Sequence, residues 1–249
     1  MAAIYCFTST GNSLYTARII ADRIGAEVFS TRAEAAVCED DVIGFVFPCY
    51  FWGPPRQVAR FVENMQIQNK NAYVFAVYTC GGPVFGVHAA LKKQLRAKNV
   101  RLSYGSRVIS VSNYLPEYKI NDTEAVRRKA EEKSRKIAEA ILNRKKSHIH
   151  LSTPFNKLVY KMFPDGNCDR RFSVSDSCNG CGICRNVCPA DNIMMTDGRP
   201  DFNHKCEHCL ACLHNCPVSA IDWKDKTQGK ERFRNTNISL EDLAAFNSR

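Results

Sequence analysis

Short apolar runs alternate with amphipathic stretches along the first 146 residues of this 249-residue chain. Apolar runs rich in β-branched and aromatic residues predict buried strands, and apolar residues three or four positions apart predict helices. The predicted strands cover 3–7, 28–30, 41–47, 72–78 and about 107–111, and the predicted helices cover 13–24, 56–65, 85–98 and 124–146. Strands that alternate with helices in this way indicate an α/β fold, with a parallel sheet covered on both faces.

The loop after the first predicted strand has the composition of a phosphate-binding turn. It contains Thr8, Ser9, Thr10, Gly11, Asn12 and Ser13 and leads directly into a predicted helix. In an open parallel sheet, ligands bind beyond the carboxyl ends of the strands, and amides at a helix N-terminus bind phosphate without Lys or Arg. The loop lacks the spacing of a Walker or G-x-G-x-x-G motif, which argues against ATP and dinucleotides. An ordinary helix cap is the alternative interpretation.

Two aromatic and glycine-containing loops follow the third and fourth predicted strands. Their candidate ligand-binding residues are Pro48, Trp52, Gly53, Thr79, Cys80, Gly81, Gly82 and Phe85. Exposed aromatic rings are costly unless a planar ligand covers them, so we predict that Trp52 and Phe85 hold a ring between their faces. Either ring could instead cap the hydrophobic core. The position of all three loops at strand ends favours the ligand site.

The segment 1–146 resembles the flavodoxins, which bind FMN with a doubly wound, five-stranded parallel sheet. The T-x-T-G-N-S turn matches that family's phosphate loop, Cys49 to Gly53 match its tryptophan-bearing loop, and Cys80-Gly81 with Phe85 match its third loop. The resemblance implies that Thr8 to Ser13 bind the FMN phosphate. It also implies that Trp52, Gly53 and Thr79 to Gly82 border the isoalloxazine ring, and Phe85 falls where many flavodoxins have a stacking tyrosine.

Two cysteine runs, twenty-eight residues apart, dominate the last third of the chain. Each is spaced C-x2-C-x2-C-x3-C-P, with Cys178, Cys181, Cys184 and Cys188 in the first run and Cys206, Cys209, Cys212 and Cys216 in the second. Three thiolates at this spacing can wrap one face of a cubane cluster while the fourth ligand comes from elsewhere. Zinc, the alternative, prefers two separated C-x2-C pairs and would leave the third cysteine of each run without a role.

The segment 172–224 resembles the bacterial two-cluster ferredoxins, which implies a small α+β domain with two 4Fe-4S clusters. By the family's rule, one cluster takes Cys178, Cys181, Cys184 and Cys216, and the other takes Cys206, Cys209, Cys212 and Cys188. Gly180 and Gly182 let backbone amides approach the sulfides of the first cluster, whereas the second run has no such glycines. We therefore expect the two clusters to differ in potential.

These boundaries divide the chain into a flavodoxin-like domain at 1–147, an ordered linker at 148–171, a ferredoxin-like domain at 172–224 and a tail at 225–249. The linker is expected to pack between the domains through Phe155, Leu158, Val159, Tyr160, Met162 and Phe163. Ser239 and Asp242 predict the start of a short final helix, and no chemistry is assigned to the tail.

Histidines and further cysteines lie outside the predicted ligand sets. His204, His208 and His214 flank the second run and are interpreted as groups near the cluster or on the surface. Five cysteines remain outside the clusters, namely Cys6, Cys38, Cys49, Cys80 and Cys168. They are interpreted as small polarisable residues, and a redox or covalent role is the alternative for Cys49 and Cys80, which lie on the predicted flavin loops.

The formal net charge of +10 does not require a nucleic-acid partner. Two oxidised clusters at about −2 each and a flavin phosphate at about −2 bring the charge to roughly +4. Helix 124–146 holds much of the remaining basic excess, in Arg127, Arg128, Lys129, Lys133, Arg135, Lys136, Arg144, Lys145 and Lys146. This helix is interpreted as a solvated face or as a docking surface for an acidic redox partner.

The cysteine content and the N-terminus bear on the compartment. Thirteen cysteines without a signal-like N-terminus favour the reducing cytoplasm over an oxidised, secreted protein. No apolar run approaches the roughly 18 residues of a membrane span. A homodimer is a further possibility if one chain does not bring flavin and cluster into tunnelling range.

The two parts together resemble the flavodoxin-ferredoxin fusion proteins of anaerobes, which implies an electron carrier with one FMN and two 4Fe-4S clusters. No acid-base or nucleophilic arrangement is evident, so no catalytic residue is assigned. An FMN-dependent reductase of a small acceptor is the first alternative, and an open ring face would favour it. A ring sealed by Trp52, Phe85 and the linker would favour the carrier. The second alternative is an iron-sulfur redox sensor that signals through partner binding.

Overall fold

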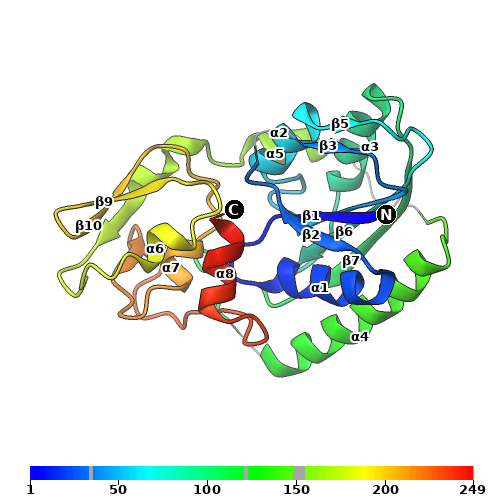
Figure 1. Ribbon diagram of the computed structural model, residues 1–249. Coiled ribbons are helices and arrows are strands. Elements are labelled where there is room, and N and C mark those ends of the chain that lie inside the picture. Colours follow the sequence, from blue (N-terminus) through cyan, green and yellow to red (C-terminus); the bar gives the residue numbers. More distant parts are fainter. Residues whose placement is uncertain (34–35, 121–122, 148–154, 249) are drawn as a thin grey trace.

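Two lobes lie side by side in the structure, a computed structural model that describes residues 1–33, 36–120, 123–147 and 155–248 (Figure 1). The larger lobe contains a five-stranded sheet, and the smaller lobe contains both cysteine runs. The C-terminal helix α8 (Leu240–Asn247) lies between them. The two cofactor-binding regions predicted from the sequence therefore meet along one shared boundary.

The sheet of the larger lobe is parallel and has the order β2-β1-β4-β6-β7. Its strands are β1 (Ala2–Cys6), β2 (Glu27–Ser30), β4 (Val42–Pro48), β6 (Tyr73–Cys80) and β7 (Leu102–Ile109). Numbered along the chain, these five strands have the order 2-1-3-4-5, which is the flavodoxin-like order of doubly wound folds. The predicted fold class of this lobe is confirmed.

Helices cover both faces of this sheet (Figure 1). One face carries α1 (Asn12–Ile24) and α4 (Thr123–Leu142), and the other carries α2 (Arg56–Asn64) and α3 (Val87–Ala97). Neighbouring residues of β1 point to opposite faces, since Ile4 packs in the core under α1 and α4 whereas Tyr5 packs in the core under α2 and α3. Both faces are apolar, as a strand buried on two sides requires.

The last strand differs most from its prediction. β7 begins at Leu102, five residues before the predicted start near 107. Gly105 interrupts the apolar pattern there, yet the glycine is needed because a Cβ atom would lie 2.4 Å from the ring of His88. A second, two-stranded parallel sheet of β3 (Val37–Cys38) and β5 (Gln66–Ile67) was not predicted, because its strands are too short to show a period.

The smaller lobe is a compact α+β unit, as predicted. Two antiparallel pairs join β8 (Phe172–Val174) to β11 (Ile221–Trp223) and β9 (Ile193–Thr196) to β10 (Arg199–Phe202). The short helices α6 (Ile183–Asn186) and α7 (Ala211–His214) occupy equivalent places in the repeat, each holding the third cysteine of its run. The internal repeat of the sequence is thus a repeat of structure.

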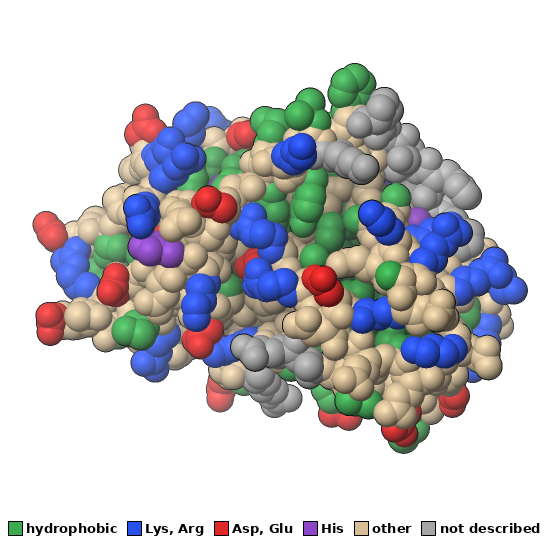
Figure 2. Space-filling view, turned by 90° about the horizontal axis from the view of Figure 1, so that it is seen from above, with side chains coloured by type: hydrophobic (Ala, Val, Ile, Leu, Met, Phe, Trp, Pro, Cys, Tyr) green, Lys and Arg blue, Asp and Glu red, His purple; other side chains and the backbone are tan. Residues whose placement is uncertain are grey.

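The linker packs against the lobes along only one side, which corrects the prediction for its apolar patch. Residues 148–154 lie outside the described residues, and the rest form α5 (Asn156–Lys161) and a 3₁₀ helix (Gly166–Arg171). Phe163 is buried, but Phe155, Leu158 and Met162 are 63%, 60% and 67% exposed. A helix this short turns one face to the protein and the opposite face to solvent. Green hydrophobic side chains accordingly gather where the lobes meet in Figure 2.

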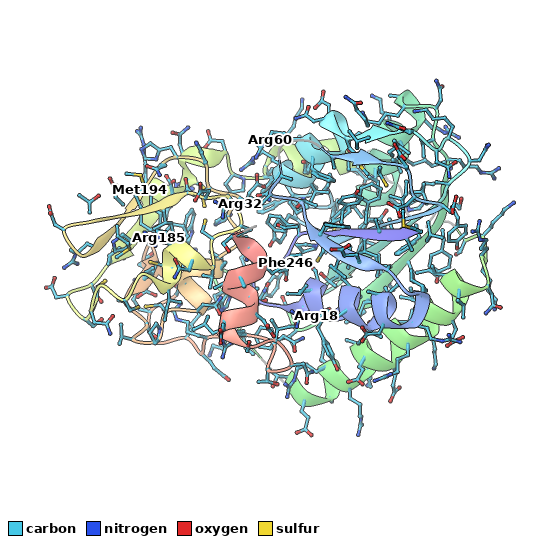
Figure 3. All side chains as sticks on the ribbon, viewed as in Figure 1. Arg18, Arg32, Arg60, Arg185, Met194 and Phe246 are labelled. Carbon is cyan, nitrogen blue, oxygen red and sulfur yellow. The ribbon has the colours of Figure 1, made fainter. Side chains whose placement is uncertain are left out.

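The tail ends in the predicted helix α8, which fastens the lobes together. The Ser239 hydroxyl accepts a hydrogen bond from the Asp242 amide at 3.0 Å, which confirms the predicted cap. Arg18 of α1 binds the Asp242 carboxylate at 3.2 Å. Arg32 donates to the Asn247 carbonyl at 2.8 Å and pairs with Asp191 of the smaller lobe at 3.0 Å. Figure 3 shows both arginines directed from the larger lobe toward this region.

Candidate cofactor-binding site

A cavity of about 490 Å³ opens at the carboxyl ends of β1, β4, β6 and β7. Its size lies within the range of about 300–1,000 Å³ that is usual for cofactor sites. Most of the predicted flavin-site residues line it, namely Thr8, Ser9, Thr10, Asn12, Ser13, Pro48, Trp52, Thr79, Cys80, Gly81 and Gly82. The remaining three, Gly11, Gly53 and Phe85, lie behind the cavity wall.

The first loop forms a hydroxyl-rich pocket at the start of α1. The hydroxyl side chains of Thr8, Ser9, Thr10 and Ser13 are all buried. Gly11 has φ +93°, a left-handed conformation that glycine adopts without strain, and α1 begins at the next residue. Within the described part of the chain, the buried Thr8 Oγ1 has no hydrogen-bond partner. An unpaired hydroxyl beside free helix-terminal amides fits a phosphate group.

The tryptophan-bearing loop is a strained two-residue turn. Tyr50 and Gly53 exchange backbone hydrogen bonds of 2.9 and 2.8 Å, and the residues between them, Phe51 and Trp52, have φ +46° and +64°. Bulky residues seldom adopt this region, and such strain is concentrated at functional sites. At Gly53 a Cβ atom would lie 2.2 Å from the Tyr160 ring. Gly53 therefore allows the linker to approach, while Phe51 and Trp52 both line the cavity.

The prediction that Trp52 and Phe85 hold a ring between them is wrong. Their ring centroids are 5.0 Å apart at an interplanar angle of 73°, so the two rings contact each other edge to face. A ring inserted between two aromatic faces needs roughly 7 Å between them, twice a carbon-carbon contact. Phe85 packs against Trp52 from outside the cavity.

A fourth loop, residues 110–118 after β7, also lines the cavity and was missed in the sequence analysis. At Gly81 a Cβ atom would lie 2.8 Å from Ser112 Cβ, so this loop touches the loop after β6. Asn113 Nδ2 donates to Thr10 Oγ1 at 2.7 Å and closes the phosphate pocket. The available signal was Tyr114 and Tyr118, two aromatic residues beyond a strand end that belongs to the same sheet edge.

The linker and the second cysteine run complete the cavity. Val159 and Phe163 line it from the linker, and His208, Cys209 and Leu210 line it from the smaller lobe. The predicted flavin site and one predicted cluster site therefore share a wall. The sequence alone could not reveal this, because the wall joins segments more than a hundred residues apart.

Two arginines of α2 hold this part of the second run in place. Arg56 Nη2 donates to the Cys206 carbonyl at 3.2 Å, and its guanidinium lies 4.2 Å from the centroid of the Phe163 ring. Arg60 pairs with the buried carboxylate of Glu207 at 3.2 Å. Burial raises the pKa of Glu207, while the guanidinium groups of Arg56 and Arg60 act against that rise. The larger lobe thus fixes the backbone that precedes His208.

The first predicted ligand set surrounds a small cavity of its own. Cys178, Cys181, Cys184 and Cys216 all line it. Burial raises the pKa of the Cys184 thiol to about 11, and the three other thiols of the set add smaller contributions. Cys181 is exposed at the surface.

In the second predicted ligand set, Cys188 and Cys212 are buried, whereas Cys206 and Cys209 are half-buried, and Cys209 lines the large cavity. Burial raises the pKa of Cys209 and of Cys212 well above the usual range. Cys188, although it belongs to the first run, is a neighbour that raises the pKa of both thiols. Burial also raises the pKa of Cys188 itself to about 11. Buried thiols with raised pKa values stay protonated and inert unless a metal displaces the proton, which suits structural cluster ligands.

A 4Fe-4S cluster takes one thiolate at each of its four irons. In a cubane each thiolate binds a different iron, so the sulfurs surround a volume instead of meeting at one atom. Among the described residues, no group of three or more His, Cys, Asp or Glu side chains is arranged around a single metal ion.

Equivalent positions of the two runs have the same backbone conformation but different residues. Gly180 and Gly182 have φ +70° and +72° in the first run. The positions twenty-eight residues later, His208 and Leu210, have φ +49° and +60°. Glycine adopts this region freely, whereas a residue with a Cβ atom pays roughly 1–2 kcal/mol. The second run therefore keeps two strained side chains where the first has none.

The three histidines near the second run have different surroundings. His204 is partly exposed and its Nδ1 lies 2.7 Å from the buried Asp169 carboxylate. His214 is buried, with Nε2 2.7 Å from the Asn113 carbonyl. His208 is buried between the rings of Tyr114 and Trp223, at centroid distances of 5.5 and 4.3 Å. Burial, then Arg56 and Arg171, lower the pKa of His208 to about 4, so its ring is neutral at physiological pH.

The tail contacts the phosphate loop, although no chemistry was assigned to it from the sequence. The Asn235 amide donates to the Thr10 carbonyl at 2.8 Å. Asn247 Nδ2 donates to the Thr8 carbonyl at 3.3 Å and to the Val187 carbonyl of the smaller lobe at 2.9 Å. The tail therefore supports the backbone of the loop through two of its carbonyl groups.

Comparison with known proteins identifies the smaller lobe. Residues 177–229 match the family of 4Fe-4S dicluster domains. A stretch of 48 residues, 19% of this chain, is 40% identical to an uncharacterized polyferredoxin-like protein of Methanocaldococcus jannaschii. The chain spans only 21% of the length of that relative. The smaller lobe is a ferredoxin-like 4Fe-4S dicluster domain.

Solved structures align with the larger lobe at low identity. An FMN-dependent NADH-azoreductase of Bacillus anthracis in complex with FMN is 9% identical with a TM-score of 0.42, over 57% of this chain and 99% of that one. A Megasphaera elsdenii flavodoxin is 15% identical with a TM-score of 0.35, over 56% of this chain and 100% of that one. The strand order, and not these alignments, establishes the doubly wound, flavodoxin-like fold. The chain thus joins a lobe with the doubly wound, flavodoxin-like strand order to a region that matches 4Fe-4S dicluster domains.

The helices were also compared with the requirements of a membrane span. In the part of the chain that the structure describes, none is both long enough and apolar enough to cross a bilayer.

Proposed function

We propose that this chain is an electron-transfer protein that binds one FMN and two 4Fe-4S clusters and exchanges electrons with a separate redox protein. Flavin exchanges one or two electrons and a 4Fe-4S cluster exchanges one, so the combination suits a converter between the two kinds of electron donor. The redox role follows from the two domains. The cofactor identity, the relay and the partner are the proposal.

The cavity supports FMN as the flavin. Its hydroxyl-rich end, with the unpaired Thr8 Oγ1 at the start of α1, would hold the single phosphate. Trp52, Gly81 and Gly82 would border the ring at the other loops. Gly53 and Phe85 would act indirectly, by letting the linker approach and by supporting Trp52.

The surroundings of the cysteines support the interleaved ligand sets. Cys178, Cys181, Cys184 and Cys216 line one cavity and would hold the first cluster. Cys206, Cys209, Cys212 and Cys188 influence one another's titration and would hold the second cluster. In both sets the fourth cysteine comes from the other run.

The observation that carries the proposal is the position of Cys209. This cysteine of the second set lines the flavin cavity directly. A flavin in the cavity and a cluster at Cys209 would be separated by little more than the cavity wall. The linker and the second run both line the cavity and would cover part of the flavin. This cover favours an electron carrier, because a reductase must admit a small acceptor to the flavin.

The exposed end of the molecule suits the partner. Cys181 of the first set is exposed, whereas every cysteine of the second set is buried or half-buried. The basic helix α4, the docking surface considered from the sequence, lies across the larger lobe from β9 and β10 in Figure 1. We therefore place the partner at the first cysteine run, and no second copy of the chain is needed to bring Cys209 to the cavity.

An anaerobic stepwise reduction of the purified chain tests this function. Flavin absorbance and low-temperature EPR are followed together, with iron, sulfide and FMN quantified in the same sample. About eight irons and one FMN per chain are expected, with electrons exchanging between flavin and clusters. Turnover of a small acceptor at the flavin, without any partner protein, would instead identify a reductase. Failure to bind flavin after reconstitution would refute the proposal.

A further inference from the structure

His208 is the most unusual polar residue of the cavity wall. It is 4% exposed and neither of its ring nitrogens has a hydrogen-bond partner among the described residues. Of the described residues that line the cavity, only Thr8 and His208 contain buried side-chain nitrogen or oxygen atoms without a partner. Buried polar groups are almost always hydrogen-bonded, and an unpaired one indicates a missing ligand or water.

The backbone at His208 is held in a conformation that glycine would adopt more easily. Its φ is +49°, and the equivalent position of the first run is Gly180. The pairs of Arg56 with the Cys206 carbonyl and of Arg60 with Glu207 anchor the residues just before it. The protein thus maintains a strained side chain in the second run only, and strain of this kind is retained where it serves a site.

The neighbours of His208 place it near the ring-binding part of the cavity. Its ring packs against Tyr114, and the Tyr114 ring in turn lies 6.0 Å from Phe51 in the tryptophan-bearing loop. The other unpaired group, Thr8, belongs to the phosphate loop. The two unsatisfied polar groups therefore lie on different walls of the cavity, one on the phosphate loop and one on the second cysteine run.

We propose that His208 hydrogen-bonds the isoalloxazine ring of FMN, so that the second cysteine run supplies a flavin-binding residue as well as cluster ligands. The inference rests on the proposed function. An imidazole nitrogen can donate to a ring carbonyl or accept from a ring N–H, and either contact would satisfy a group that is otherwise unpaired. The ferredoxin-like domain then takes part directly in flavin affinity.

Three substitutions in the full, cluster-loaded chain test the inference. His208→Leu removes both nitrogens, His208→Asn keeps an N–H near the position of Nδ1, and His208→Gln keeps one near the position of Nε2. The matched control is His204→Asn, which removes a histidine from the same segment outside the cavity and at a similar φ of +58°. After removal of flavin, the FMN dissociation constant is measured anaerobically by fluorescence quenching. Iron content, cluster EPR and the flavin midpoint potential are measured on the same samples.

The expected result is a dissociation constant raised about tenfold in His208→Leu, as for the loss of one hydrogen bond. Either Asn or Gln, whichever matches the bonding nitrogen, should bring it back to within about threefold of wild type. The cluster EPR signals should be unchanged in all variants. The FMN dissociation constant of His204→Asn should equal that of the wild type.

Two outcomes would overturn the inference. Wild-type affinity and flavin potential in His208→Leu would show that the flavin makes no contact with this ring. An equal loss in Leu, Asn and Gln, or a loss of clusters in all three, would assign the residue to packing. If the wild-type chain binds no FMN, the proposed function fails and this inference fails with it. That result is distinct from both others, because it is seen without any substitution.

Discussion

The two cysteine runs have the same spacing but contribute differently to the molecule. The first run lies at a surface, with Cys181 exposed and glycines at both left-handed positions. The second lines the cavity with His208, Cys209 and Leu210, and His208 and Leu210 occupy its left-handed positions. The repeat preserves the cluster-binding backbone, whereas the residues between the cysteines have diverged. The first run thus presents a cysteine to solvent, and the second run forms part of the cavity wall.

The difference shows how one fold unit can provide two unlike electron-transfer sites. Cluster spacing needs only the cysteines and a backbone that can turn, so the intervening residues remain available for other contacts. In the second run, those contacts are with α2 through Glu207 and with the cavity through His208 and Leu210. Solvent exposure and nearby hydrogen bonds set cluster potentials, so we expect two unequal potentials.

The largest effects should come from removing one ligand of each set. Cys181→Ser and Cys209→Ser should each lower the iron content from about eight to about four per chain, because each disables one cluster. Only Cys209→Ser should also alter the flavin absorbance spectrum and FMN affinity, since Cys209 lines the cavity. Iron analysis and an FMN titration of both variants measure this difference.

Each cysteine variant is the control for the other. Equal disturbance of the flavin in both would contradict the asymmetry between the runs. Loss of all eight irons in either variant would show that one cluster cannot assemble without the other.

Glycine substitutions in the first run come next. A Cβ atom at Gly180 would lie 2.8 Å from the Gly198 carbonyl oxygen, whereas at Gly182 nothing lies within 4 Å. Both have positive φ, so Gly180→Ala should destabilise by about 3 kcal/mol and Gly182→Ala by about 1 kcal/mol. The stability of each variant is measured from the urea concentration at which half of the cluster absorbance is lost. Equal costs would mean that the Gly198 backbone moves aside.

A feature of this structure could be predicted from the sequence when the residues that form it lie close together along the chain. Strand alternation, the Thr8–Ser13 loop and the cysteine spacing are local patterns, and each predicted an element or a cluster of residues that the structure brings together. The contact between Trp52 and Phe85 depends on side-chain direction across two loops, so it was predicted wrongly. The cavity position of His208 depends on how two lobes dock, which no local pattern encodes.

A moderate effect is expected where the tail joins the lobes. Asn247→Ala removes two buried hydrogen bonds, to the Thr8 and Val187 carbonyls, and should cost about 2 kcal/mol of stability. Ser248→Ala is the control, because Ser248 Oγ bonds only the Ala245 carbonyl of the same exposed helix end at 3.1 Å. Urea unfolding followed by tryptophan fluorescence compares the two. If both variants unfold alike, the Asn247 side chain does not stabilise the junction, and the contacts of the tail through Asn235 and Arg32 would have to hold it.

The smallest effect should come from Arg60, which approaches the second run from the solvent side. The Arg60 side chain is 61% exposed, whereas that of Glu207 is 1% exposed. Solvent therefore screens the guanidinium group strongly but does not reach the carboxylate. Arg60→Ala should cost about 1 kcal/mol, more than an ordinary surface pair because it leaves a buried carboxylate with less compensation. Arg18→Ala, which removes the exposed pair with Asp242, should cause no measurable change. Urea unfolding at increasing salt concentration distinguishes a partly buried ion pair from an exposed one. Added salt should reduce the stability difference between wild type and Arg60→Ala only in part. If Arg60→Ala matched Arg18→Ala, the ion pair would add nothing, and the second run would be anchored by the Arg56 bond to the Cys206 carbonyl and by the backbone amides at the start of α2.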